Sequence, residues 1–297
     1  MSAVCAGARD VVYRYDLTLG LPHTNRRGLW EPLLLMHAGH YLWQSIATAI
    51  GRPLSELRTV SGGEVYAAFY YVEERIPAHT PIESFGLDAT VRFSIALRAF
   101  KNIAFEGLVH FDRPGVLEDA SVEHPFIRTG NIFITPVQGN SQLRVAPPAN
   151  VDMSAIPSLP NEDNPYHLTR EAKANGTLGL IDDSWVPIGD AFESLHEIDV
   201  DRDTNGAGLV YFVHYITYME RAERTMAEAG RLPAGERTLA HRKTAYFGNA
   251  DPRDTIRVRI AACQDPRRAD RIGLRYIIER QQDGELICLS EALKTLL

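Results

Sequence analysis

The chain has 297 residues, of which 45% are hydrophobic and 23% charged, an ordinary composition for a globular protein. Its formal net charge of −7 argues against a general nucleic-acid binder, which is usually basic. The cysteines Cys5, Cys263 and Cys288 show no paired spacing, so neither a disulfide framework nor a zinc site is indicated. No signal-peptide pattern and no run of ~18–20 apolar residues is found, so we expect a cytoplasmic protein.

The first half of the sequence predicts one long helix among β-strands. Apolar residues at helical spacing run from Glu31 to about Ile50, where Gly51 and Pro53 stop the pattern. Alternating or aromatic-rich segments predict the strands. These strands are residues 11–18, residues 64–75, two within residues 89–112 with a turn at Asn102, and an edge strand at residues 126–135.

The composition changes after residue 135. Residues 136–165 carry six prolines and few large apolar side chains, so we expect a long connection rather than a regular element. After Trp185 the order of the first half returns, with a strand, a polar glycine loop, a long helix and further strands. The predicted strands are residues 194–200, 238–246, 256–262, 272–279 and 286–289.

The second helix follows the turn Asn205-Gly206-Ala207-Gly208 and begins at Phe212. Such a helix start leaves backbone N–H groups without partners, which can bind an anion or a polarised carbonyl; the alternative is that the glycines only permit a tight loop. Glu220 and Arg224 are one turn apart and are expected to pair on the outside of this helix.

The two halves repeat the same elements at similar spacing. The helix onsets Glu31 and Phe212 are 181 residues apart, and the strand centres Tyr66 and Ala245 are 179 apart. A strand, a long helix and antiparallel strands, used twice, predict an α+β double hot-dog fold. We expect hot-dog units at residues 1–140 and 186–297, joined by a proline-rich connection at 141–185. Since sheet edges in such units often pair, a homodimer is also expected.

The loop before the second helix has a family likeness. Residues 205–212, NGAGLVYF, look like the D-P-A-G-I-V-F-Y segment of hot-dog thioesterases of the hydroxybenzoyl-CoA type. Asn205 stands where that family has its catalytic aspartate. This departure argues against simple hydrolysis, which uses the carboxylate.

Five segments carry a closer resemblance: GLPHTNRRGLWEPLLL, EVYAAFYYVEE, NPYHLTR, DTNGAGLVYFVHYITYMERAER and RKTAYFGNADPRDT. Together they resemble the LnmK-type family of bifunctional acyltransferase/decarboxylases of polyketide biosynthesis, over nearly the whole chain. The resemblance implies a double hot-dog enzyme that takes methylmalonyl-CoA, releases CO₂ and loads a propionyl-type group on an acyl carrier protein. It implies no cofactor besides the CoA thioester and the carrier's phosphopantetheine arm.

In that family a tyrosine is the essential catalytic residue and is proposed to carry the acyl group. The resemblance places it at Tyr66. Strict alternation in residues 64–75 puts Tyr66 and Tyr70 on one face and Phe69 and Tyr71 on the other, so Tyr70 is the rival and a substrate-binding candidate. A strand tyrosine is more often packing, and a phenol with a pKa near ~10 needs a base or a positive neighbour to act as a nucleophile.

Two polar loops supply the other candidates. Asn205 is predicted as catalytic, because its amide can hold a thioester oxygen as negative charge develops, with Gly206 and Gly208 binding substrate beside it. His23, predicted as catalytic, and Thr24, predicted to bind substrate, occupy the corresponding place in the first half. We expect them to bind the carboxylate that leaves as CO₂. The simpler alternatives are a turn or cap residue and a surface loop.

No metal is expected, since the ten histidines show no HxH, HExxH or carboxylate-spaced set. Residues 248–252 are most simply a turn, although they could border the site. A basic rim for CoA or carrier phosphates is also predicted. Its members are Arg26, Arg27, Arg242, Lys243, Arg253 and Arg257.

Three rival functions remain open at this stage. A plain thioesterase should have a carboxylate at position 205, and a dehydratase a His/Asp pair in its tunnel. A non-catalytic partner of a synthase complex would bind a carrier protein without turnover.

Overall fold

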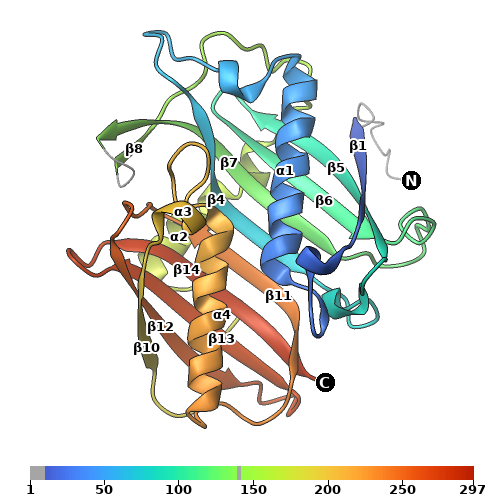
Figure 1. The fold of residues 1–297 in the computed structure, drawn as a ribbon, viewed down its shortest axis with the longest axis vertical. Helices are drawn as coiled ribbons and strands as arrows, with labels where there is room; N and C mark the ends of the chain where they lie inside the picture. Colours follow the sequence, from blue (N-terminus) through green and yellow to red (C-terminus); the bar gives the residue numbers. More distant parts are fainter. Residues whose placement is uncertain (1–10, 139–141) are drawn as a thin grey trace.

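The computed structural model describes residues 11–138 and 142–297. Their main feature is one 12-stranded sheet with the order β1-β5-β6-β7-β4-β11-β14-β13-β12-β10, to which β8 and β9 attach. The two long helices, α1 (Glu31–Ile50) and α4 (Phe212–Glu228), lie side by side on one face of this sheet (Figure 1). Each helix is wrapped by its own half of the sheet, as the repeated pattern predicts.

The first unit has the elements predicted from its sequence, but one strand lies elsewhere. Its sheet strands are β1 (Val12–Thr18), β4 (Tyr66–Arg75), β5 (Thr90–Phe100), β6 (Ala104–Asp112), β7 (Phe126–Gln138) and β8 (Gln142–Val145). The segment predicted as an edge strand, β7, instead lies between β6 and β4. The sequence did not show this position, because β4, the partner of β7 on the side away from β6, is distant along the chain.

The second unit repeats the same order of strands. These are β9 (Val186–Pro187), β10 (Phe192–Glu197), β11 (Arg237–Tyr246), β12 (Thr255–Gln264), β13 (Arg271–Arg280) and β14 (Leu286–Leu296). The last strand is much longer than the predicted residues 286–289, because it continues as a mostly buried ladder between β11 and β13. The strand order in one half is thus the reverse of that in the other, as a two-fold axis between β4 and β11 requires.

The two units join through antiparallel pairing of β4 with β11, in which Glu73 faces Lys243. Each strand has a β-bulge at the same distance from this pair, at Tyr70 in β4 and at Ala240 in β11. Equivalent positions in these strands are therefore 170 residues apart, and not the predicted 179. The sheet edges that were expected to pair are thus paired within the chain, and the homodimer stays a prediction.

The bulge also corrects the predicted strand faces. Phe69 and Val72 pack into the core under the helices, although they are three residues apart. Tyr70 and Tyr71 both lie on the opposite face, in one small cluster. Tyr71 therefore points away from the face predicted for it, because the extra residue of a bulge resets the alternation of side chains.

The apolar stripe of α1 explains why this segment is helical and where it lies. A proline in the first turn favours the helix start, and Gly51 in the left-handed conformation (φ 64°) ends it. The stripe faces the sheet, and each of its side chains is at most 3% exposed. These residues are Leu34, Leu35, Ala38, Leu42 and Ile46.

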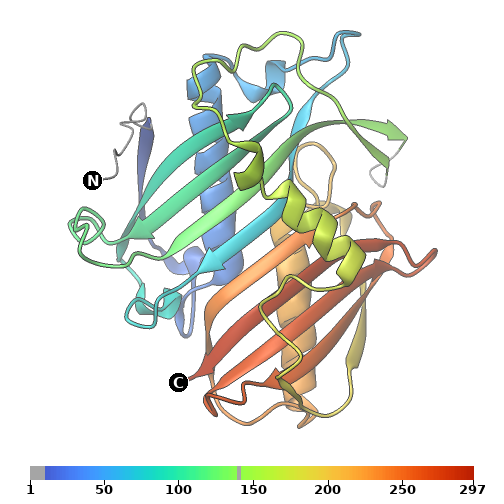
Figure 2. The ribbon, with the colours of Figure 1, turned by 180° about the vertical axis from the view of Figure 1, so that it is seen from behind.

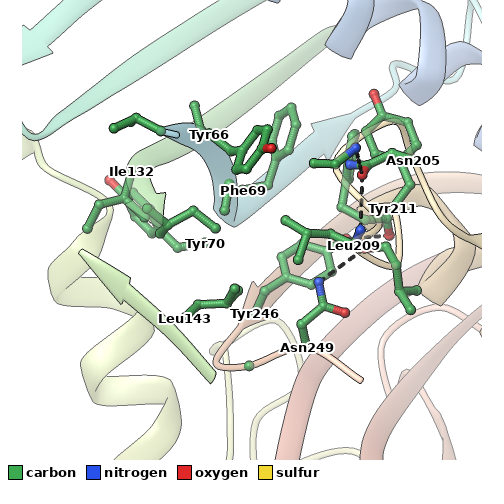
Figure 3. Close-up of a pocket in the computed structure, with 18 of the residues that line it drawn as sticks. Tyr66, Phe69, Tyr70, Ile132, Leu143, Asn205, Leu209, Tyr211, Tyr246 and Asn249 are labelled. Atoms are coloured by element: carbon green, nitrogen blue, oxygen red, sulfur yellow. Dashed lines mark hydrogen bonds between the residues drawn. The ribbon is translucent and has the colours of Figure 1, made fainter. Parts of the chain in front are cut away.

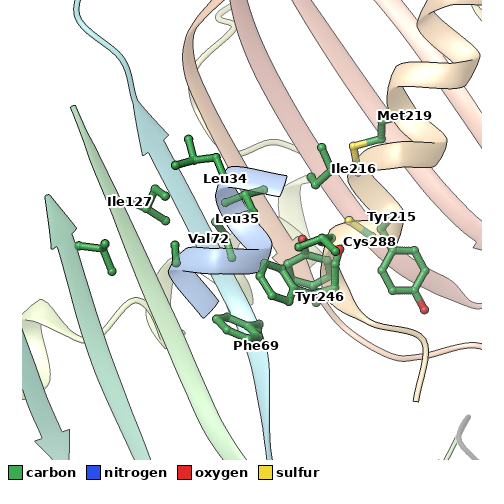
Figure 4. Packing of buried hydrophobic residues seen from close by; sticks show 14 of the residues in the cluster. Leu34, Leu35, Phe69, Val72, Ile127, Tyr215, Ile216, Met219, Tyr246 and Cys288 are labelled. Carbon is green, nitrogen blue, oxygen red and sulfur yellow. Dashed lines mark hydrogen bonds between the residues drawn. The ribbon is translucent and has the colours of Figure 1, made fainter. Parts of the chain in front are cut away.

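The core is continuous across the two units. The ring of Phe69 in β4 stacks on Phe212, the first residue of α4, with the centroids 3.9 Å apart. Around this pair, Leu35 and Val72 of the first unit and Ile216 of the second pack in one buried cluster (Figure 4). The start of α4 is therefore held against β4, the strand of the first unit that lies at the seam.

The predicted connection is more structured than its prolines indicate. Besides β8, it contains the helix α2 (Tyr166–Asn175), which lies on the face of the sheet opposite to α1 and α4 (Figure 2). Ala172 of this helix packs against Ala245 and Leu289. Only Thr169 and Ala172 of α2 are buried, so its sequence lacks a clear apolar stripe. The predicted unit boundary at residues 140 and 141 lies outside the described residues.

A tight contact on the same face yields a test of the packing. A Cβ atom at Gly130 would stand 2.5 Å from the ring of Tyr70, on the neighbouring strand. Gly130→Ala should therefore lower the free energy of unfolding by about 1–3 kcal/mol, since the ring is fixed by its own contacts. Urea unfolding measures this loss. Gly86→Ala, where no atom lies within 4 Å, is the control, and equal stabilities of both variants would contradict the packing described.

Candidate functional site

The sheet opens at the seam between the units. Along β4, residues Tyr71–Arg75 pair with β11, whereas the described ladders pair Tyr66–Phe69 with β7 alone. A cavity of about 1020 Å³ lies at this unpaired end of β4. Its lining comes from both units, with the end of β4 on one side and the loop before α4 on the other (Figure 3). Trp43 of α1 also lines it. This volume is in the range of small-molecule sites.

The loop before α4 is built around Asn205. The side-chain oxygen of Asn205 accepts hydrogen bonds from the backbone N–H of Ala207 (3.0 Å) and of Leu209 (3.2 Å). The backbone of Gly208 has the positive φ (73°) that this turn needs, and Thr204 pairs with Val210. The oxygen is thus committed to the loop, and within the described residues the Nδ2 group has no partner. Asn205 is both the turn residue and a free donor at the cavity wall.

Tyr66 lines the same cavity as Asn205, although the two residues come from different units. Its hydroxyl donates a short hydrogen bond to the Glu64 carboxylate. This hydrogen bond, with burial and the charge of Glu64, raises the pKa of the Tyr66 phenol above its usual value. The phenol is therefore protonated at neutral pH, beside a carboxylate that can accept its proton.

Tyr70 also reaches the cavity, from the bulge of β4. Its hydroxyl donates to Asn164 Oδ1 (2.9 Å) in a buried contact, and Asn164 Oδ1 also accepts from the backbone of Tyr166 (3.0 Å). Burial raises the pKa of the Tyr70 phenol well above its usual value. The Tyr70 hydroxyl is thus engaged in a buried hydrogen bond with Asn164, which indicates a structural role for this side chain.

His23 and Thr24 do not lie among the described residues that line this cavity. Thr24 begins the short hairpin of β2 (Thr24–Asn25) and β3 (Gly28–Leu29). His23 Nδ1 accepts from the backbone of Gly20 (2.8 Å), and the His23 ring meets His37 edge-on. The structure therefore separates these two candidates from Tyr66 and Asn205. His23 and Thr24 lie at the start of α1, whereas the cavity lies beside the loop before α4. Gly206 lines the cavity, and Gly208 lies in the same turn.

The sequence did not predict several polar residues at the inner end of the cavity. Asn249 donates from Nδ2 to the Val210 carbonyl (3.3 Å) and accepts from the Tyr215 hydroxyl (2.9 Å). The Tyr246 hydroxyl donates to the Phe212 carbonyl (3.3 Å). These bonds fix the loop before α4 to the end of β11. The sequence signal for these residues was the turn at residues 248–252, which was noted as a possible border of the site.

The predicted basic rim does not include Arg242. This side chain is fully buried, and its Nε lies 2.6 Å from Glu31 and 3.8 Å from Glu74. Burial, together with the neighbouring Glu31, raises the pKa of Glu74 well above its usual value. Arg242 lies on the inward face of β11, and its buried partners come from α1 and β4.

Glu220 faces inward as well, instead of pairing with Arg224 on the outside. Its Oε2 accepts from Trp30 Nε1 (2.6 Å), and burial together with Glu31 raises the pKa of Glu220 to about 7. A carboxyl whose pKa is higher in the folded protein stabilises it fully below the unfolded pKa, and this contribution is lost as the pH rises through about 7.

Glu220→Gln should therefore gain about 2 kcal/mol of unfolding free energy relative to the parent between pH 5 and pH 8. The amide oxygen can still accept from Trp30, so the gain reflects the removed charge. Urea unfolding at both pH values measures it, with the exposed Glu228→Gln on the same helix as control. A difference between parent and variant that does not change with pH would contradict the raised pKa of Glu220.

Within residues 11–138 and 142–297, no group of three or more His, Cys, Asp or Glu side chains is placed to hold a metal ion. In the same ranges, no helix has both the length and the apolar character that crossing a membrane requires.

The fold is shared with solved thioesterase structures. The chain is similar to a protein assigned as an oleoyl thioesterase from Lactobacillus plantarum, with a TM-score of 0.64 and 14% identity over 98% of this chain and 97% of that one. It is also similar to the 12:0-ACP thioesterase from Umbellularia californica, with a TM-score of 0.64 and 10% identity over 96% and 94% of the two chains.

An acyl-ACP thioesterase from Bacteroides thetaiotaomicron has a TM-score of 0.58 and 10% identity, over 95% of this chain and 97% of that one. No protein-family model matches the sequence, and no curated protein matches it. At these identities the similarity shows the fold, which extends over almost the whole of each chain.

Proposed function

We propose that this protein is an enzyme that binds an acyl thioester in the seam cavity and acts on it with Tyr66 and Asn205. The observation that carries the proposal is that these two residues, predicted from separate segments, line one cavity between the units. The cavity combines an apolar wall with a few polar groups, as is typical of sites for small organic ligands. Solved structures with the same fold are named as acyl thioesterases, which supports this substrate class.

Asn205 is suited to stabilise negative charge on the thioester oxygen. Its side-chain oxygen is fixed by two backbone N–H groups, so the orientation of the amide is set and Nδ2 is the remaining donor. A donor held in place before the reaction stabilises a developing oxyanion or enolate without reorganisation. This role needs no carboxylate at position 205.

Tyr66 is proposed to accept the acyl group. Its phenol oxygen would attack the thioester carbonyl while the phenol proton passes to Glu64, and the C–S bond would break to release the CoA thiolate, which takes up a proton. The raised pKa of Tyr66 makes this proton transfer essential. The same hydroxyl could instead donate a hydrogen bond to the enolate, a role that requires no adduct.

The reaction that we propose for these groups is decarboxylative acyl transfer from a malonyl-type thioester. Breaking the bond to the carboxylate leaves its electron pair as an enolate, which Asn205 stabilises before a proton returns to carbon. The apolar wall, which includes Phe69 and Trp43, favours the loss of a charged carboxylate as neutral CO₂. Transfer to the thiol of an acyl carrier protein would then free Tyr66.

Hydrolysis is the second candidate function. The solved structures that share the fold are named as thioesterases, and this favours a water acceptor in place of a carrier thiol. The only carboxylate that we find among the described lining residues is Glu285, and Arg280 pairs with it. A hydrolase would have to activate water without a free carboxylate in that lining.

One experiment separates these functions. The protein is incubated with methylmalonyl-CoA and a holo acyl carrier protein, and all products are followed by mass spectrometry. A propionyl-type group on the carrier with CO₂ release supports decarboxylative transfer, whereas free acid indicates a thioesterase. A dehydratase would instead act on a 3-hydroxyacyl carrier thioester supplied in parallel. No turnover of any of these thioesters would contradict an enzymatic function.

A further inference from the structure

The first unit has its own version of the loop before the helix. The hairpin of β2 and β3 precedes α1, as the bridge between Thr204 and Val210 precedes α4. Each loop has a glycine with a positive φ, Gly28 (129°) and Gly208 (73°). The two-fold arrangement of the sheet thus places a second potential site at the start of α1.

A second cavity, of about 940 Å³, is present there. It shares none of its described lining residues with the first cavity. Arg224 occupies the position in α4 that Trp43 occupies in α1, counted from each helix start, and each of them lines the cavity of the opposite unit. One cavity is therefore aromatic where the other is cationic.

The charges lining the second cavity are unevenly matched. Five cationic side chains line it, against four carboxylates. Arg27 lies 3.1 Å from Glu83 and 3.6 Å from Glu236, and Lys294 lies 2.6 Å from Glu223. The fourth carboxylate, Glu220, accepts from the indole of Trp30. Among the described residues, these pairs leave Arg26 and Arg224 without a carboxylate partner.

The cationic side chains that have no carboxylate partner among the described residues are arginines. Within the described part of the chain, the side chains of Arg26 and Arg224 make no hydrogen bond or ion pair. Arg237 lines the same cavity, and its buried Nε has no hydrogen-bond partner among the described residues. A guanidinium matches phosphate in charge and in geometry, since it can donate two parallel hydrogen bonds.

From this arrangement we infer that the second cavity is a binding site for a phosphorylated small molecule. The phosphate is held by Arg26 and Arg224 at the opening, with Arg237 further in, and the remainder of the ligand contacts Trp30. This site is separate from the chemistry at Tyr66 and Asn205, so it can be present whether or not the proposed reaction is correct.

Isothermal titration calorimetry with inorganic pyrophosphate tests this inference. The parent should bind saturably, and more weakly at higher salt, because the contacts are ionic. The double variant Arg26→Ala/Arg224→Ala should bind at least about 10-fold more weakly. Arg170→Ala/Arg267→Ala removes the same charge from two exposed arginines outside the cavity and should bind as the parent does. No saturable binding, or equal loss in both double variants, would overturn the inference.

Two further arms locate the ligand and define its class. Binding should change the tryptophan fluorescence of the parent but not of Trp30→Phe, because Trp30 lines the cavity. ADP is titrated in parallel: tighter binding than pyrophosphate identifies a nucleotide ligand, and equal binding identifies the phosphate as the recognised group. Tyr66→Phe should bind pyrophosphate normally, which separates this site from the proposed function. A fluorescence change that persists in Trp30→Phe would place the ligand elsewhere.

Discussion

Tyr66→Phe is expected to lower acyl transfer by about 10³-fold or more, because removing a covalent acceptor eliminates the pathway instead of weakening it. Stability should hardly change, because among the described residues the hydroxyl bonds only Glu64, which is exposed. The unfolding free energy should therefore stay within about 0.5 kcal/mol of the parent. Quenched reactions analysed by mass spectrometry measure transfer and map any acyl adduct at the same time. An adduct on Tyr66 in the parent would establish its role as acceptor.

The matched control is Tyr70→Phe in the same strand. This change removes the bond to Asn164 and should cost about 1 kcal/mol of stability, while most activity remains. Glu64→Gln separates the two possible roles of Tyr66, since it removes the proton acceptor but keeps a hydrogen-bond partner. Slow adduct formation in Glu64→Gln supports attack by the phenol. A fully active Tyr66→Phe would rule out both roles and make Tyr70 the candidate.

Replacement of Asn205 should affect the decarboxylation step by a comparable amount. Loss of one donor to a developing oxyanion costs about 2.7–4 kcal/mol in the barrier, which is about 10²–10³-fold in rate. Asn205→Ala also removes the acceptor for Ala207 and Leu209, so it disturbs the loop as well. Release of CO₂ from methylmalonyl-CoA, measured against substrate concentration, separates the chemical step from binding.

Asn205→Asp is the cleaner comparison. The carboxylate can still accept both backbone hydrogen bonds of the loop, so the fold of the turn is preserved while the Nδ2 donor is lost. The added negative charge should weaken binding of a malonyl-type acid, and some hydrolysis of simple acyl thioesters is expected. If both Asn205 variants decarboxylate at near-parental rates with unchanged affinity, Asn205 has no part in stabilising the oxyanion.

The fold could be predicted because its signals are local and occur twice. Both long helices show an apolar stripe, and both begin at the predicted residues, Glu31 and Phe212. The seam between β4 and β11 follows from the two exposed edges that such units leave. The presence of Tyr66 and Asn205 in one cavity also follows, since each unit brings its helix start to the other unit's seam strand, β4 or β11.

The remaining features depend on contacts that periodicity does not report. A single extra residue at Tyr70 reverses the direction of Tyr71, and nothing in the alternating run marks the bulge. Arginine is usually exposed, so the sequence places Arg242 at the surface. It is buried because its carboxylate partners are supplied by α1 and β4, which are distant along the chain. His23 precedes α1 as Asn205 precedes α4, so the two residues hold equivalent positions in different units. Equivalent positions lie apart in the structure, and His23 is therefore at the start of α1, away from Asn205.

Because both units belong to one polypeptide, the residues at the start of α1 and those at the start of α4 can differ from each other. In a dimer of identical chains, one codon change would alter both ends at once. Here position 43 can remain tryptophan while position 224 becomes arginine, and neither choice constrains the other. Engineering can therefore reshape the seam cavity, for acyl-chain preference for example, without altering the charged cavity at the start of α1.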